Sequence, residues 1–184
     1  EYIYLNQPEV KKQVLHSKIA EFLEEKLYGD NRDRHLYPKI IYHYSNSNNI
    51  EKNLEYTIKN LSLYSSVKYE MYPSFYNYQD ILQDKFNIEE SFNEVENLLN
   101  NCKEKSLSYT NYKMKFLYIK GRYNISNGNY KEGLKNIHEF IDYAEKIDDK
   151  SNRIDGYKQM IFYGIQVNNT IVMNKYIKNL QEVI

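Results

Sequence analysis

Tryptophan is absent from this 184-residue sequence, and cysteine, alanine, proline and glycine are scarce, with one, two, three and six residues. A single cysteine cannot form an internal disulfide, which excludes a small secreted scaffold stapled by disulfides. No run approaches the roughly 18 apolar residues that a membrane span requires, and no basic-then-apolar leader opens the chain. Basic and acidic residues number 25 each, so no net charge attracts nucleic acid or an anionic membrane. We therefore expect a cytoplasmic protein without nucleic-acid or membrane partners.

Tyrosine, asparagine, lysine and isoleucine are abundant instead, with 21, 23, 21 and 19 residues. These four share codons rich in A and T, so genome composition is the simplest explanation of the bias. Hydrophobic residues make up 41% of the chain, and their regular spacing predicts a packed fold. The chain begins with Glu1 rather than methionine, and we expect it to be a fragment of a larger protein.

Almost every segment repeats its apolar residues at the helical period. A first helix follows Pro8 and ends at Gly29, with one apolar stripe made of Val10, Val14, Leu15, Ile19, Phe22, Leu23 and Leu27. Further helices are predicted at 36–44, 54–64, 72–85, 88–105, 108–126, 130–147, 152–166 and 170–184. No segment alternates long enough to be a strand, and the short string at 69–72 is rejected. The fold class is therefore all-α.

Three helix starts share a capping pattern in which asparagine stands three residues before glutamate. The segments are Asn48–Glu51, Asn87–Glu90 and Asn129–Glu132. The asparagine side chain can accept from a first-turn amide, and the glutamate lies favourably in the helix dipole. The Asp148–Asp149 pair is expected to cap the following helix in the same way.

An internal repeat of about 40 residues links apolar or small positions with the spacing i, i+4, i+7. The matching sets are Leu54, Ile58 and Leu61; Val95, Leu99 and Cys102; Gly133, Ile137 and Phe140; and Met173, Ile177 and Leu180, with Tyr42, Gln83, Gly121 and Ile161 as matching points on the preceding helices. A hairpin with one stripe per helix cannot bury both stripes alone, so successive hairpins stack into a solenoid. We expect one helical-repeat domain over 1–184, with a leading helix at 1–30 and hairpins at 31–66, 70–105, 107–147 and 151–184.

Two glycines support this arrangement. Glycine inside a helix costs about 1 kcal/mol relative to alanine and is tolerated where two helices cross closely. Gly121 and Gly133 each lie where helices of one hairpin would cross.

The segment from Gly121 to Leu134 resembles a tetratricopeptide repeat. Gly121, Gly128, Tyr130 and Gly133 occupy the small, turn, tyrosine and small positions of that family, whereas Asn124 replaces its usual aromatic residue. The period near 40 also exceeds the family's 34, which longer helices would explain. The resemblance implies a right-handed α-α superhelix of about four hairpins plus an N-terminal helix.

The first third of the chain carries a second resemblance. His16–Leu23, Ile41–Asn48 and Leu54–Tyr56 are similar to the region that follows the ATPase module in STAND-class signalling proteins, although Asn48 and Asn53 replace the usual glycine and alanine. This resemblance implies a non-catalytic interaction module of a larger bacterial signalling or regulatory protein. Its partners would be a protein, a peptide or neighbouring domains of the same chain.

No chemical motif indicates catalysis, so we expect a protein that is not an enzyme and holds no cofactor or metal. The segment Gly128–Gly133 lacks the Gly-Lys-Ser/Thr ending of a phosphate-binding loop. His16, His35, His43 and His138 show no i, i+3 or i, i+4 spacing for metal, and His43 is expected to cap or hydrogen-bond within its hairpin. Cys102 falls on an apolar face, where it acts as a small hydrophobe.

One helix mixes basic and aromatic residues and supplies the predicted partner-binding site. Lys115, Tyr118 and Arg122 share a face at i, i+3 and i+7, whereas Leu117 and Gly121 lie on the core face. In tetratricopeptide-like solenoids the first helix of each hairpin lines the concave groove, which implies that Lys115, Tyr118, Arg122 and Ser126 point into it. An acidic peptide or a C-terminal carboxylate could bind there through Arg122 and Lys115. An ordinary solvated helix face is the alternative.

Three further hypotheses stay open. A peptide-sensing repeat domain would bind a short peptide in its concave groove through inward asparagine side chains. An enzyme would need a site assembled from distant residues such as His43, Cys102 and the paired carboxylates. A solenoid fragment could also form a homodimer through exposed ends.

Overall fold

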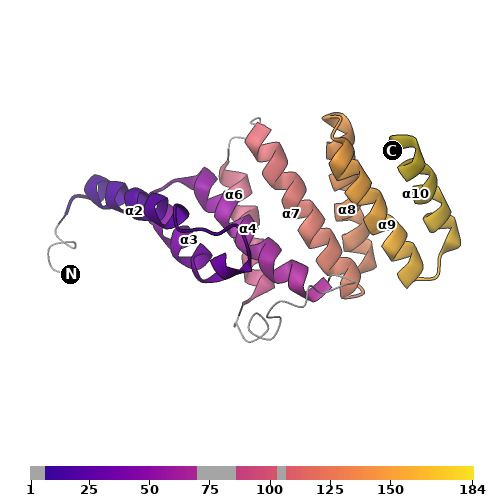
Figure 1. Cartoon of the computed structure of the whole chain (residues 1–184), viewed down its shortest axis with the longest axis horizontal. Coiled ribbons are helices and arrows are strands. Elements are labelled where there is room, and N and C mark those ends of the chain that lie inside the picture. The colour runs from indigo at the N-terminus through magenta and orange to yellow at the C-terminus, as the bar shows by residue number, and fades with distance from the viewer. Residues whose placement is uncertain (1–6, 70–85, 103–106) are drawn as a thin grey trace. The chain divides into compact units, whose positions relative to one another are not determined.

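A computed structural model describes residues 7–69, 86–102 and 107–184. In these ranges every regular element is a helix and no strand occurs, which confirms the predicted all-α class (Figure 1). The elements are α2 (Glu9–Glu24), the 3-10 helix η1 (Asn31–His35), α3 (Tyr37–Asn46), α4 (Ile50–Tyr69), α6 (Ile88–Asn101), α7 (Leu107–Ser126), α8 (Tyr130–Lys146), α9 (Lys150–Gln166) and α10 (Thr170–Val183). The helix predicted at 72–85, with Gln83, lies outside the described residues.

The chain divides into two compact units, Glu1–Tyr109 and Thr110–Ile184. None of the described helices combines the length and apolarity that a bilayer crossing needs.

In unit 1, α2 packs on α3 and α3 packs on α4. Their shared core consists of Ala20, Ile40, Tyr44 and Tyr56, each at most 3% exposed. The predicted stripe on the first helix is right only in part, because Leu23 and Leu27 pack against this core whereas Val10, Val14, Leu15 and Phe22 are exposed. The face that packs holds His16 and Ala20, a polar and a small residue that a count of large apolar side chains passes over.

The first helix is also shorter than predicted. It ends at Glu24, and the chain then turns through Gly29, which adopts a φ of 79°. Asp33 fixes this turn, because its carboxylate accepts the backbone amides of Tyr28 and Gly29 at 2.8 Å each.

The contact between α4 and α6 follows the predicted repeat closely. Leu54, Ile58 and Leu61 on α4 are buried, as are Val95 and Leu99 on α6. Cys102 is only partly buried, because it forms the C-terminal cap of α6 rather than an interior position. Tyr42, the repeat's matching point on α3, is 59% exposed.

In unit 2, α7 and α8 cross at the two predicted glycines. A methyl group on Gly121 would lie 2.6 Å from Cδ1 of Ile137, and one on Gly133 would lie 2.9 Å from the backbone nitrogen of Ile125. Ile137 therefore occupies the space that Gly121 leaves empty, and Ile125 occupies the space that Gly133 leaves empty. The prediction that these glycines mark a close crossing is confirmed.

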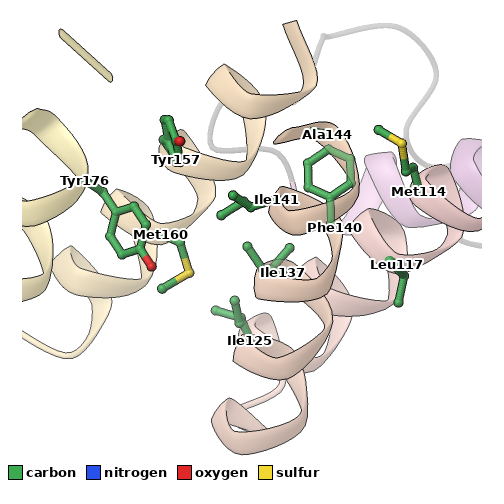
Figure 2. Close-up of a cluster of buried hydrophobic side chains, with 10 residues drawn as sticks. All are labelled: Met114, Leu117, Ile125, Ile137, Phe140, Ile141, Ala144, Tyr157, Met160 and Tyr176. Atoms are coloured by element: carbon green, nitrogen blue, oxygen red, sulfur yellow. The ribbon is translucent and has the colours of Figure 1, made fainter. Parts of the chain in front are cut away.

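The core of unit 2 draws side chains from all of its helices. Figure 2 shows ten buried residues from α7 to α10 meeting in one cluster: Met114, Leu117, Ile125, Ile137, Phe140, Ile141, Ala144, Tyr157, Met160 and Tyr176. The repeat correctly predicted that Gly133, Ile137 and Phe140 are buried, and the last two belong to this cluster.

The last set of the repeat is only partly right, because Leu180 packs against this core whereas Ile177 is exposed. Ile177 is 37% exposed, and Met173 and Leu180 are only partly buried. The buried residue of α10 is Tyr176. The helix α10 packs on α9, which covers one face of α10. Ile177 lies beside that covered face.

Four turns share one backbone conformation. Asn48, Gly128, Asp148 and Asn168 each adopt a φ between 52° and 80°, and each precedes the residue before a helix. In every case the amide of the following residue donates to the carbonyl five residues earlier, as Asp149 does to Ala144 at 2.8 Å. Three of these turns recur every 20 residues, so the 40-residue repeat is two helix-and-turn units.

The capping predictions succeed in part. Asn87 accepts the amides of Glu89 and Glu90, and Asp149 accepts the amide of Asn152 at 3.0 Å, both as predicted. The cap predicted at Asn48 is wrong, because Asn48 takes the left-handed turn position and Asn49 accepts the amide of Lys52 instead. Asn129 precedes α8, but its side chain accepts no cap hydrogen bond.

Candidate interaction surface

The helix α7 carries the predicted partner-binding residues and has an unusual charge. Its 20 residues include four basic side chains (Lys113, Lys115, Lys120, Arg122) and no acidic one. Helices of globular proteins commonly offset such cations with acidic neighbours at i±4. A helix with one sign of charge therefore offers a surface suited to an anionic partner.

The four predicted residues lie on the outer side of this helix. Lys115 and Ser126 are exposed, whereas Tyr118 and Arg122 are partly buried. Leu117 is 3% exposed, and Gly121 is buried beside Ile137, so the predicted core positions of these two residues are confirmed.

Tyr118 and Arg122 form an ordered pair on this face. The Arg122 guanidinium carbon lies 5.4 Å from the centroid of the Tyr118 ring, within the range of a cation–π contact. The same ring packs against Phe140 of the core at a centroid distance of 5.0 Å. Arg122 is therefore held on a fixed platform, which lowers the entropy cost of presenting its guanidinium.

A second helix continues the surface. Forty residues after the α7 set, α9 presents Asp155, Lys158, Phe162 and Gln166 at the same register. Phe162 is 39% exposed, and Lys158 lies 3.6 Å from Asp155. The side-chain amide of Gln166 donates to the carbonyl of Ile125 at 3.5 Å, which links the ends of α9 and α7.

The charge of the two units differs, although the total is zero. Unit 2 contains 12 lysine and arginine against 8 aspartate and glutamate residues, a formal charge of +4. Unit 1 contains 13 against 17, a formal charge of −4. The zero net charge of the whole chain is therefore the sum of two opposite charges. Unit 2 by itself is positively charged, which the total charge does not reveal.

Two histidines that sequence spacing left apart lie in direct contact. Nδ1 of His16 on α2 lies 2.7 Å from Nδ1 of His43 on α3. The predicted hydrogen bond of His43 therefore exists, but it reaches the leading helix instead of staying within the hairpin. Burial, together with the neighbouring His16, lowers the pKa of His43.

Glu24 at the end of α2 is the centre of a second cluster that the sequence did not suggest. The Tyr44 hydroxyl donates to its carboxylate at 2.7 Å, and Lys52 lies 3.1 Å away. Burial and this carboxylate raise the pKa values of Tyr44 and Tyr56. Both phenols therefore stay protonated at neutral pH and act as donors that fix α2, α3 and α4 together.

The remaining chemical candidates serve as helix caps or lie apart. Burial and Glu51 raise the pKa of the Cys102 thiol, which disfavours the nucleophilic thiolate. The carboxylates of Asp149 and of Glu89–Glu90 lie at helix starts. Among the described residues no three histidine, cysteine or acidic side chains gather as a metal-ligand set.

Comparison of the chain with known protein families, with curated proteins and with solved structures found no match.

Proposed function

We propose that this chain is a non-catalytic protein–protein or interdomain interaction module of a larger signalling protein. Its architecture would be the right-handed α-α superhelix implied by the tetratricopeptide resemblance. The observation that carries this proposal is the recurring helix-and-turn unit, with its left-handed residue at Gly128, Asp148 and Asn168. Repeats of this kind build extended surfaces for partners, because each unit contacts only its neighbours.

The resemblance to the region after a STAND ATPase module fits the roles of its residues in unit 1. Ala20 is fully buried and His16 is 5% exposed, and both lie where α2 meets α3. Asn48 adopts the left-handed conformation that glycine has at Gly128. These residues therefore support a structural motif that joins a leading helix to a hairpin, which is the role expected of a connector between domains.

The α7 face, defined as Lys115, Tyr118, Arg122 and Ser126, is the proposed partner-binding surface. Its partner would be an acidic segment of another protein or of a neighbouring domain, because α7 has no acidic residue and unit 2 carries a formal charge of +4. Arg122 on its Tyr118 platform would form charge-assisted hydrogen bonds with a carboxylate.

A peptide-sensing domain is the second candidate, and Phe162 is the observation that favours it. This side chain is 39% exposed at the α9 position equivalent to Arg122. A short peptide with an acidic and an apolar residue could use both positions, whereas a folded domain would require a wider surface.

Fluorescence anisotropy tests the surface with a fluorescein-labelled decapeptide of alternating glutamate and serine. We expect binding that weakens with salt, and a loss of about fivefold in affinity, roughly 1 kcal/mol, for Arg122→Gln and for Lys115→Gln. Lys178→Gln is the matched control, because Lys178 is an exposed lysine on α10. Equal binding of a lysine–serine peptide, or an equal loss for Lys178→Gln, would remove the assignment.

The two candidates are separated by varying the peptide. A peptide sensor should prefer one order of acidic and apolar residues by tenfold or more, since Phe162 and Arg122 occupy fixed positions. An interaction module that recognises an acidic surface should show a preference that follows charge alone.

A further inference from the structure

The His16–His43 contact can hold only a limited number of protons. The two Nδ1 atoms are 2.7 Å apart, and His16 is 5% exposed. At this distance one ring must donate a hydrogen and the other must accept it with a lone pair. Two hydrogens on the facing nitrogens would collide, so one Nδ1 must stay unprotonated while α2 is docked.

Protonation of the pair therefore has two different steps. The first proton binds Nε2 of the donor ring and leaves the Nδ1–H···Nδ1 bond in place. The second must bind the accepting Nδ1, which removes the acceptor and places two cations in contact. The titration belongs to the pair, and its second step opposes docking.

Several charged groups on the packed elements have partners of their own. The charged side chains of these elements are Glu9, Lys11, Lys12, Lys18, Glu21 and Glu24 on α2, Arg32, Asp33 and Arg34 on η1, Lys39 on α3, and Glu51, Lys52, Glu55 and Lys59 in the first ten residues of α4. Glu9 pairs with Lys12 at 2.8 Å, and Glu55 lies 3.4 Å from Lys52. Asp33 accepts the amides of the turn after α2. Besides burial, His16 is the neighbour that lowers the pKa of His43.

The two halves of α2 are held in different ways. Glu24 anchors the second half through Tyr44 and Lys52. The first half reaches α3 through the histidine pair, and the Tyr42 ring packs edge-on against the His16 ring at 5.7 Å. Loss of the pair would therefore free the first half of α2 before the second.

We propose that the His16–His43 pair is a pH-sensitive contact that holds the first half of α2 on α3 at neutral pH and releases it when both rings are protonated. The release is favoured as pH falls, because the undocked rings bind one proton more than the docked pair. The stabilisation that the histidine pair gives to docked α2 is complete above the ordinary histidine pKa of 6.5 and is lost progressively below it.

Hydrogen exchange measured by mass spectrometry at pH 7.5 and 5.0 tests the proposal on the full chain, after correction for intrinsic exchange rates. Complete exclusion of the second proton would lower the protection of residues 11–16 by about 30-fold at pH 5.0, and partial exclusion would lower it by less. We expect a fall of roughly 3- to 30-fold in this segment, while residues 50–60 of α4 stay unchanged.

Three variants separate the causes. His43→Gln should abolish the pH dependence, because a glutamine can accept from or donate to His16 in either protonation state. His16→Gln is the reciprocal variant and should behave in the same way. His35→Gln is the matched control, since His35 is exposed on η1, and it should keep the wild-type response.

The proposal fails if residues 11–16 keep their protection at pH 5.0, or if His43→Gln and His16→Gln lose protection in this segment as the wild type does. It also fails if α4 loses as much as α2, since acid would then unfold the whole unit. Local exchange is the required readout, because burial and Lys175 also lower the pKa of His138 in unit 2, and global unfolding would mix both effects.

Discussion

The crossing of α7 and α8 gives a double-mutant prediction whose sign follows from the structure. Ile137 is fully buried, and its Cδ1 and Cγ1 atoms would lie 2.6 and 2.7 Å from a methyl group on Gly121. Ile137→Ala removes these atoms and should cost about 2–4 kcal/mol in the free energy of unfolding, because it leaves a cavity. Gly121→Ala gains about 1 kcal/mol of helix propensity and loses about 1–3 kcal/mol to overpacking.

The double variant Gly121→Ala/Ile137→Ala should be more stable than the sum of the two single variants. The new methyl group enters the space that Ile137 leaves, which removes the clash and fills part of the cavity. We expect a favourable coupling of about 1–2 kcal/mol. Urea denaturation followed by circular dichroism at 222 nm measures all four proteins under one set of conditions.

A matched control uses a glycine in open space. Gly128 adopts a φ of 80° and would place a methyl group near no other atom, so Gly128→Ala should destabilise through backbone strain and show no coupling with Ile137→Ala. Additive effects in the Gly121–Ile137 cycle, within about 0.5 kcal/mol, would refute the crossing geometry.

Two further predictions concern a helix start and self-association. Asp149→Ala should destabilise by about 1 kcal/mol, since Asp149 accepts the amide and the side-chain amide of Asn152. Asp148→Asn serves as control, because it removes the ion pair with Arg153 and keeps a residue that tolerates the left-handed conformation. Thermal unfolding that ranks the two variants in reverse would contradict the cap. Exposed isoleucine and valine side chains on the first and last described helices, Ile171 at 81% and Val10 at 70%, lead us to propose weak homodimerisation. Sedimentation velocity should show association that Ile171→Lys or Val10→Lys reduces, and a sedimentation coefficient independent of concentration would exclude it.

Much of the helical fold could be predicted because helix periodicity is a local property. The starts of α8 and α10 fall where the apolar spacing indicated, and the paired glycines at 121 and 133 were visible as helix-interior exceptions. The turns were harder to see as a repeat. Glycine, asparagine and aspartate all accept the left-handed conformation, so a search for glycine finds Gly128 and misses Asn48, Asp148 and Asn168.

Burial on the outer helices was predicted less well. A stripe of large apolar residues identifies the buried face only where a helix is covered on that face. The buried residues are His16 and Ala20 on α2 and Tyr176 on α10; Leu23 and Leu180 only pack beside them, and Val14 and Ile177 stay accessible. Sequence spacing could not reveal the histidine pair, because His16 and His43 are 27 positions apart and no helical spacing relates them.

The α7 face was predictable from local spacing, but the nature of its partner depends on an aromatic contact. A formal charge of +4 on unit 2 would also suit a single-stranded nucleic acid, which binds basic grooves by stacking bases on exposed aromatic rings. Tyr118 is the aromatic residue at the centre of this face, and its ring contacts both the Arg122 guanidinium and Phe140. Because both contacts occupy the ring, a carboxylate that binds Arg122 fits this face better than a base that needs the Tyr118 surface. A fluorescein-labelled oligothymidine of ten residues should therefore bind more weakly than the glutamate–serine decapeptide at equal salt. Tighter binding of the oligothymidine, lost in Tyr118→Leu, would reverse this assignment.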